Sequence, residues 1–121
     1  MKVVYIGIAG ALGTITRYLI ASTIDRGLAS SFPAGTVVVN ALGCLLAGVL
    51  IAVISQRFPQ SEVASSILMI GFLGGFTTFS AFALQTFTLF SKGQLILALT
   101  NLLVSNIVGV LAVWAGYSLA S

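Results

Sequence analysis

Apolar residues fill four long runs that are separated by short polar segments. The interruptions lie at residues 25–27 (Asp-Arg-Gly), 55–62 and 91–93 (Ser-Lys-Gly). A helix needs about 20 predominantly apolar residues to cross the hydrocarbon core of a bilayer. The pattern therefore predicts four membrane-spanning helices, at residues 3–24, 34–54, 63–90 and 94–119.

The composition agrees with an all-α integral membrane protein that forms one membrane domain over residues 1–121. Hydrophobic residues make up 59% of the chain and charged residues only 6%, whereas a soluble domain carries roughly 25% charged residues. The apolar stretch Val3–Ile15 could also be read as a signal peptide. Because Arg17 follows it and no small-x-small cleavage site precedes the second run, we interpret it as the first membrane helix. A multi-pass protein of the cell membrane is expected.

Several kinds of chemistry are excluded by the residue inventory. The chain has no His and one Cys, Cys44, so a Cys/His zinc site or an internal disulfide cannot form. The only carboxylates, Asp25 and Glu62, fall in predicted loops, which makes an enzyme improbable. The net charge of +3 comes from scattered residues, so no nucleic-acid-binding surface is expected.

The orientation of the chain in the membrane is poorly specified by its charges. With four spans, Lys2 and Arg57 fall on one side, and Arg26 and Lys92 on the other, with Arg17 near the end of the first span. Orientation normally follows an excess of Lys and Arg on the cytoplasmic side. Without that excess, two copies can insert in opposite directions and pair about an axis in the membrane plane. A single orientation despite weak bias is equally compatible with the charges.

The third span contains a segment with weak helical propensity, GFLGGFTTFS at residues 71–80. Two adjacent glycines and two β-branched threonines both disfavour a helix. A break at membrane depth exposes backbone carbonyls and N–H groups that can hold ions. The alternative is close helix packing through Gly71 and Gly75. The threonines favour the break.

Polar side chains lie on one face of the second and of the fourth span. Thr36 and Asn40 are one turn apart, and so are Asn101 and Ser105. An amide without a partner is costly in hydrocarbon. Asn40 therefore bonds another helix or faces a polar path, and the stripe on the fourth span fits either role.

Charge and aromatic rings add further candidates for a polar path. Arg17 is the only charged residue within a predicted span, and it serves either a vestibule or an interface anchor. Phe79 and Phe82 share a helix face, and their ring edges carry the partial positive charge that an anion prefers. A lipid-facing position is preferred for the other phenylalanines considered, Phe72, Phe87 and Phe90.

Together these segments resemble the CrcB/Fluc family of fluoride channels. The matching motifs are GAxGxxxRY at residues 10–18, PxGTxxxNxxG at 33–43 and GFLGGFTTFSxF at 71–82. The resemblance implies an antiparallel, dual-topology homodimer with two pores that passes fluoride passively and lowers its cytoplasmic concentration. A heterodimer of two oppositely oriented paralogues is also compatible with the weak charge bias.

The resemblance also implies roles for individual residues. Phe79 and Phe82 would be the pore phenylalanines and Asn40 the amide donor to fluoride. Arg17 would lie in a vestibule, and the carbonyls of Gly74 and Thr77 would hold a structural sodium ion. Two further residues would lie near or along the pore, Ser80 and Ser105.

Two departures from the family pattern stand out. Relatives usually carry Glu where this chain has Gln85, so its spans contain no carboxylate. On the fourth span, some relatives carry Tyr, Ser and Thr in place of the residues here, Asn101, Gly109 and Val113.

Two other functions compete with the channel. A small dual-topology, proton-coupled drug exporter would need an ionisable intramembrane residue, and Arg17 does not deprotonate. A non-conducting membrane assembly subunit would explain the glycines and Asn40 as packing, but gives no reason for the TTFS segment and its phenylalanines.

Overall fold

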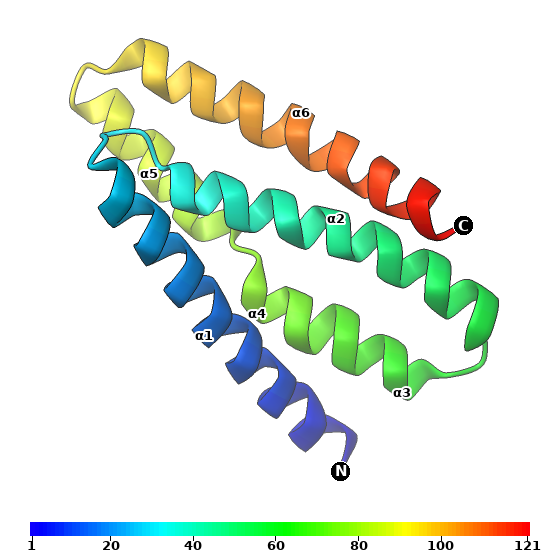
Figure 1. The fold of residues 1–121 in the computed structure, drawn as a ribbon. Helices are drawn as coiled ribbons and strands as arrows, with labels where there is room; N and C mark the ends of the chain where they lie inside the picture. The colour runs from blue at the N-terminus through cyan, green and yellow to red at the C-terminus, as the bar shows by residue number, and fades with distance from the viewer.

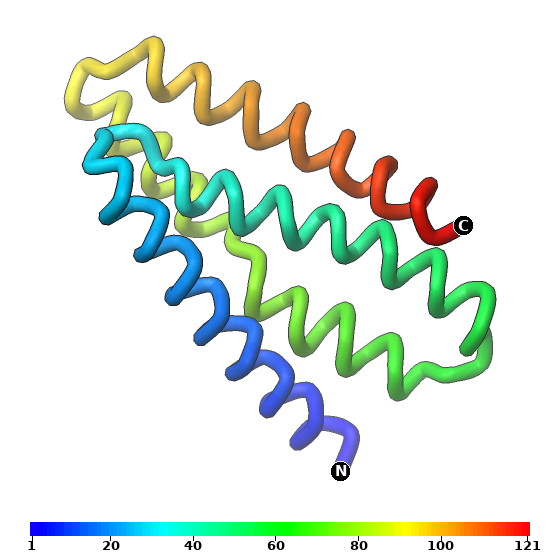
Figure 2. The backbone as a smooth tube through the Cα atoms, viewed as in Figure 1, coloured from blue at the N-terminus to red at the C-terminus, as the bar shows by residue number.

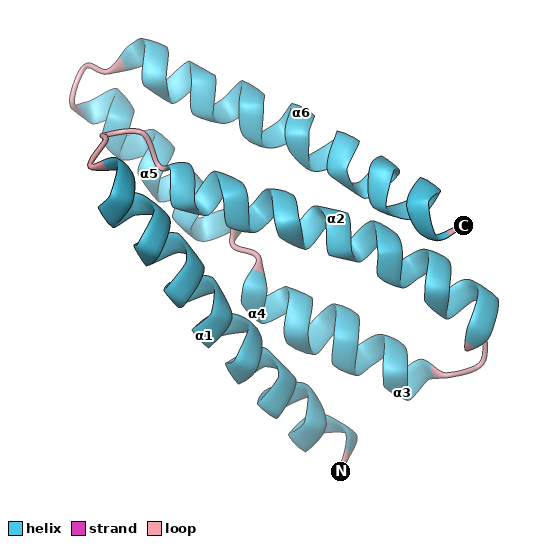
Figure 3. Cartoon of the chain, viewed as in Figure 1, coloured by secondary structure: helices cyan, strands magenta, loops and turns pink.

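The computed structural model describes residues 1–121 and consists of helices joined by short loops (Figures 1 and 3). The elements are α1 (Lys2–Leu28), α2 (Ala34–Arg57), α3 (Glu62–Ser65), the π-helix η1 (Ser66–Leu73), α4 (Gly74–Phe76), α5 (Phe79–Ser91) and α6 (Leu95–Ala120). The segments from α3 to α5 form one interrupted span, so four helical spans are long and apolar enough to cross a membrane. The predicted four spans are confirmed.

The chain runs up and down between two ends of the molecule. Both termini and the loop after α2 lie at one end, and the loops after α1 and α5 lie at the other (Figure 2). Helix α1 continues four residues beyond its predicted end and stops at Ala29, which adopts a left-handed conformation with φ 45°. The prediction that Asp25 lies in a loop is therefore wrong, and so is that for Glu62, which begins α3.

Helices α2 and α6 pack with their backbones in direct contact. A Cβ atom on Gly48 would collide with the carbonyl of Val113, and one on Gly116 would collide with the carbonyl of Leu45. Small residues allow membrane helices to approach this closely. Each glycine faces the backbone of the other helix. A larger side chain at either position would therefore push α2 and α6 apart.

Replacing Gly116 by Ala should therefore destabilise the protein. The added methyl group meets backbone atoms, and overpacking of this kind costs about 1–3 kcal/mol. Thermal unfolding of the detergent-purified protein should show a lower Tm. Gly7→Ala is the matched control, because a Cβ atom at Gly7 has no neighbour within 4 Å. An unchanged Tm for Gly116→Ala would contradict the tight contact.

Helix α1 packs in the same way against the first half of the interrupted span. A Cβ atom on Gly13 would overlap the carbonyl of Phe72, and one on Gly75 would overlap the carbonyl of Gly10. The interpretation of Gly71 and Gly75 as a close packing pair is thus confirmed, together with the break that follows them. The π-helical turn in η1 has no counterpart in the sequence pattern; such turns occur frequently at functional sites.

Candidate ion pathway

The third span is interrupted at two threonines. Thr77 (φ −85°, ψ 157°) and Thr78 (φ −148°, ψ 115°) are extended, while Gly74 and Gly75 remain helical in α4. The helix is therefore broken at the two threonines and not at the glycine pair. Thr78 also begins the next helix, since its hydroxyl accepts a hydrogen bond from the N–H of Ala81 at 3.2 Å. The β-branched side chain disfavours the helix and then caps its continuation.

The break releases two backbone carbonyls from helical hydrogen bonds. In a continuous helix, Thr78 N–H would bond to the carbonyl of Gly74 and Ala81 N–H to that of Thr77. Here Thr78 N–H donates to the side chain of Asn40 and Ala81 N–H to the hydroxyl of Thr78. The carbonyls of Gly74 and Thr77 receive no other hydrogen bond. They are the two carbonyls predicted to hold a cation.

Asn40 binds the broken segment through both ends of its amide. Its Oδ1 accepts the N–H of Thr78 at 2.8 Å, and its Nδ2 donates to the carbonyl of Thr78 at 3.0 Å. The backbone N–H can only donate, so it fixes which end of the amide is the oxygen. Nδ2 keeps a second N–H for another acceptor. Asn40 thus joins two helices, and it also lines a groove.

This groove has a volume of about 440 Å³ and is lined by residues of α2, η1, α4, α5 and α6 and by the break between α4 and α5. The rings of Phe79 and Phe82 lie 5.7 Å apart with an interplanar angle of 49°, which excludes a face-to-face stack. Phe79 is 79% exposed, so the groove is open on one side. Predicted residues that line it are Asn40, Gly74, Thr77, Phe79, Phe82 and Ser105.

A second cavity of about 550 Å³ lies between α1, α2 and α5. It contains Arg17 and Thr36, which the structure therefore separates from the phenylalanine groove. Arg17 Nε donates to the carbonyl of Gly75 at 3.2 Å, and the rest of its guanidinium remains available for other acceptors. Thr78 lines both cavities, so the Asn40–Thr78 contact lies where the two meet.

The polar stripe of the fourth span contributes both to packing and to the groove. Asn101 is 1% exposed and donates to the hydroxyl of Thr86 at 2.8 Å, which bonds α6 to α5. Ser105 donates to the side chain of Asn101 at 3.3 Å and lines the groove. Ser80 does not line it, although its hydroxyl lies 3.4 Å from that of Thr78.

Sequence reasoning did not single out every residue that lines the groove. Asn106 and Cys44 are two that it missed. An amide in an apolar span was the available signal for Asn106. Gln85 lies on the other cavity, and its buried Oε1 has no hydrogen-bond partner.

Comparison with known proteins identifies the family. Residues 4–117 match the sequence model described as CrcB-like protein, Camphor Resistance (CrcB). The chain belongs to the CrcB-like family. It is 43% identical over 115 residues to a protein of Desulforapulum autotrophicum named fluoride-specific ion channel FluC, covering 95% of this chain and 92% of the relative.

Other relatives in the CrcB-like family carry the same name. A protein from Magnetococcus marinus is 37% identical over 116 residues, covering 96% of this chain and 94% of the relative. One from Solibacter usitatus is 37% identical over 120 residues, covering 99% and 98%. With this membership and four helices able to span a membrane, the protein is a multi-pass membrane protein.

Proposed function

We propose that this protein is a fluoride-selective, passive ion channel that lowers cytoplasmic fluoride. The observation that supports it best is the groove without any charged group on which amides, a hydroxyl and two phenyl rings converge. These groups belong to Asn40, Asn106, Ser105, Phe79 and Phe82. The relatives named fluoride-specific ion channel FluC support the same class. Transport, not catalysis, is thus the activity.

The chemistry of the groove suits a small, strongly hydrated anion. Such an ion enters only where hydrogen-bond donors replace its water. Asn40 is held by Thr78 with its oxygen engaged and one N–H free, so it offers a donor and not an acceptor. Ring edges supply further positive partial charge. Arg17, in the adjoining cavity, would attract the anion into a vestibule.

The functional unit is proposed to be an antiparallel, dual-topology homodimer with two pores. Two features support this arrangement. Phe79 is largely exposed, so the groove of one chain lacks a wall, and a second copy would supply it. The weak charge bias between the two ends of the chain also permits insertion in both orientations. A paralogue of opposite orientation could take the place of the second copy.

A structural sodium ion is proposed at the centre of the dimer. Carbonyl oxygens are hard ligands suited to such a cation, and the unbonded carbonyls of Gly74 and Thr77 fit this donor set. When bound, the ion would supply a fixed positive charge that offsets the cost of bringing an anion into a low-dielectric region. The two carbonyls would hold the ion without any carboxylate, because no cluster of three or more acidic, His or Cys side chains is present.

Fluoride efflux from liposomes that contain only this purified chain tests the proposal. The vesicles are loaded with potassium fluoride, and release is followed with a fluoride electrode. We expect rapid release only after valinomycin lets potassium carry the balancing charge. Release driven by a pH gradient and indifferent to valinomycin would indicate a coupled transporter. If this chain releases no fluoride and a paralogue restores release, the unit is a heterodimer; no release with either would contradict the channel.

A further inference from the structure

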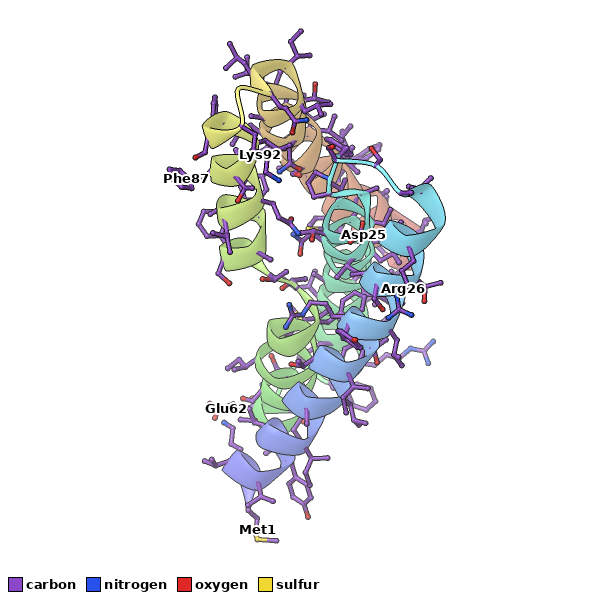
Figure 4. The ribbon with its side chains drawn as sticks, turned by 90° about the vertical axis from the view of Figure 1, so that its left-hand side faces the viewer. Met1, Asp25, Arg26, Glu62, Phe87 and Lys92 are labelled. Carbon is purple, nitrogen blue, oxygen red and sulfur yellow. The ribbon has the colours of Figure 1, made fainter.

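The cavity between α1, α2 and α5 is lined by one acidic and one basic residue. Arg17 and Asp25 both line it, and no other charged side chain does. Both come from α1, eight residues apart, so about two helical turns separate them. Asp25 also lines the adjoining groove toward Lys92. In Figure 4, Asp25 and Lys92 lie toward the same end of the molecule, and Glu62 and Met1 toward the other.

The carboxylate of Asp25 is held in place by the backbone at the start of α2. Its Oδ1 accepts the N–H of Gly35 at 2.8 Å. Gly35 allows this approach, because a Cβ atom there would lie 2.8 Å from both carboxylate oxygens. The first N–H groups of a long helix attract anions. In this protein one of them is already occupied by a side chain, and the negative charge is fixed at the cavity.

We propose that Asp25 sets the access of anions to the cavity that holds Arg17, by placing a fixed negative charge at its edge. The inference rests on the proposed fluoride channel. The carboxylate repels an anion that approaches Arg17 and offsets the attraction of the α2 N-terminus. Arg17 lies eight residues earlier on α1, where it still draws the anion inward. Entry is thus limited by a charge that the wall of the cavity itself carries.

Replacing Asp25 by Asn removes the charge and keeps the acceptor. The amide oxygen of Asn can take the Gly35 N–H, and Asn is as good a capping residue as Asp. We expect fluoride current through Asp25→Asn in planar bilayers to rise about twofold at about 0.01 M ionic strength, where charges act over roughly 30 Å. At 1 M the screening length is about 3 Å, and the variant should match the wild type.

Two controls separate this position from a general effect of charge. Glu62→Gln removes the same charge from a residue that lines neither cavity and is paired with Lys2 at 3.9 Å. Arg26→Gln changes the residue next to Asp25. Arg26 itself lines none of these cavities. Glu62→Gln, at the other end of the molecule, should leave the current unchanged. Arg26→Gln removes a positive charge within the screening length of roughly 30 Å at 0.01 M salt, so it should lower the current there and match the wild type at 1 M.

The outcomes distinguish this inference from the proposed function. Wild-type fluoride current with no increase in Asp25→Asn at low salt would overturn the role of Asp25 alone. An increase that persists at 1 M salt would also overturn it, because a through-space charge is screened there. Absence of fluoride current in the wild type would overturn the proposed channel, and the role of Asp25 with it.

Discussion

Asn40→Asp should reduce fluoride flux by about 30-fold or more. The substitution removes the N–H groups that bond to the carbonyl of Thr78 and face the groove, and it brings a carboxylate beside the proposed path. Two unit charges about 4 Å apart repel by ~4 kcal/mol at an effective dielectric constant of 20. Half of that energy corresponds to about a 30-fold loss in rate. Liposome efflux with valinomycin measures the change.

A second variant separates the added charge from the broken contact. Asn106→Asp places a carboxylate on the same groove but leaves the Asn40–Thr78 bonds intact, since Asn106 bonds only to the carbonyl of Leu102. We expect a smaller loss for Asn106→Asp than for Asn40→Asp. Gel filtration must show that both variants are folded. Wild-type flux in folded Asn40→Asp would remove Asn40 from the pathway.

The spans and the interruption could be predicted because each depends on local composition. A charge-free run of sufficient length has few alternatives to a membrane helix, and two β-branched threonines weaken a helix wherever they lie. The end of α1 was misplaced because Asp25 and Arg26 look like loop residues. In the structure both residues belong to α1, which ends at Ala29. The carboxylate of Asp25 accepts a hydrogen bond from the N–H of Gly35, ten residues later.

The site could be predicted only in part, because it depends on which helices meet. The i, i+4 spacing of Thr36 and Asn40 places them on one face, yet the helix passes between two cavities and each residue lines a different one. The hydrogen bond between Asn101 and Thr86 joins two helices and cannot be seen in either alone. The same holds for Asn40 and Thr78, because the bond from Thr78 N–H to Asn40 leaves the carbonyl of Gly74 free.

Phe82→Leu should reduce fluoride flux by about tenfold. Leucine keeps most of the apolar volume but has no ring edge. Edge interactions between aromatic rings are worth about 0.5–1.5 kcal/mol, and a value near the upper end of that range corresponds to roughly tenfold in rate. Phe87→Leu makes the same change on the same helix, but Phe87 is 67% exposed and does not line the groove; it should keep wild-type efflux.

The pair of variants decides what the phenylalanines of α5 do. If ring edges stabilise the passing anion, fluoride flux falls when Phe82 is replaced by leucine. By the same reasoning it also falls when Phe79 is replaced, because the two rings lie 5.7 Å apart. If the rings only fill space or face lipid, leucine replaces either one without effect, and Phe82→Leu matches Phe87→Leu. That equality would leave the groove with its amide and hydroxyl donors alone, such as Asn40, Asn106 and Ser105, and would contradict a path stabilised by the rings of Phe79 and Phe82.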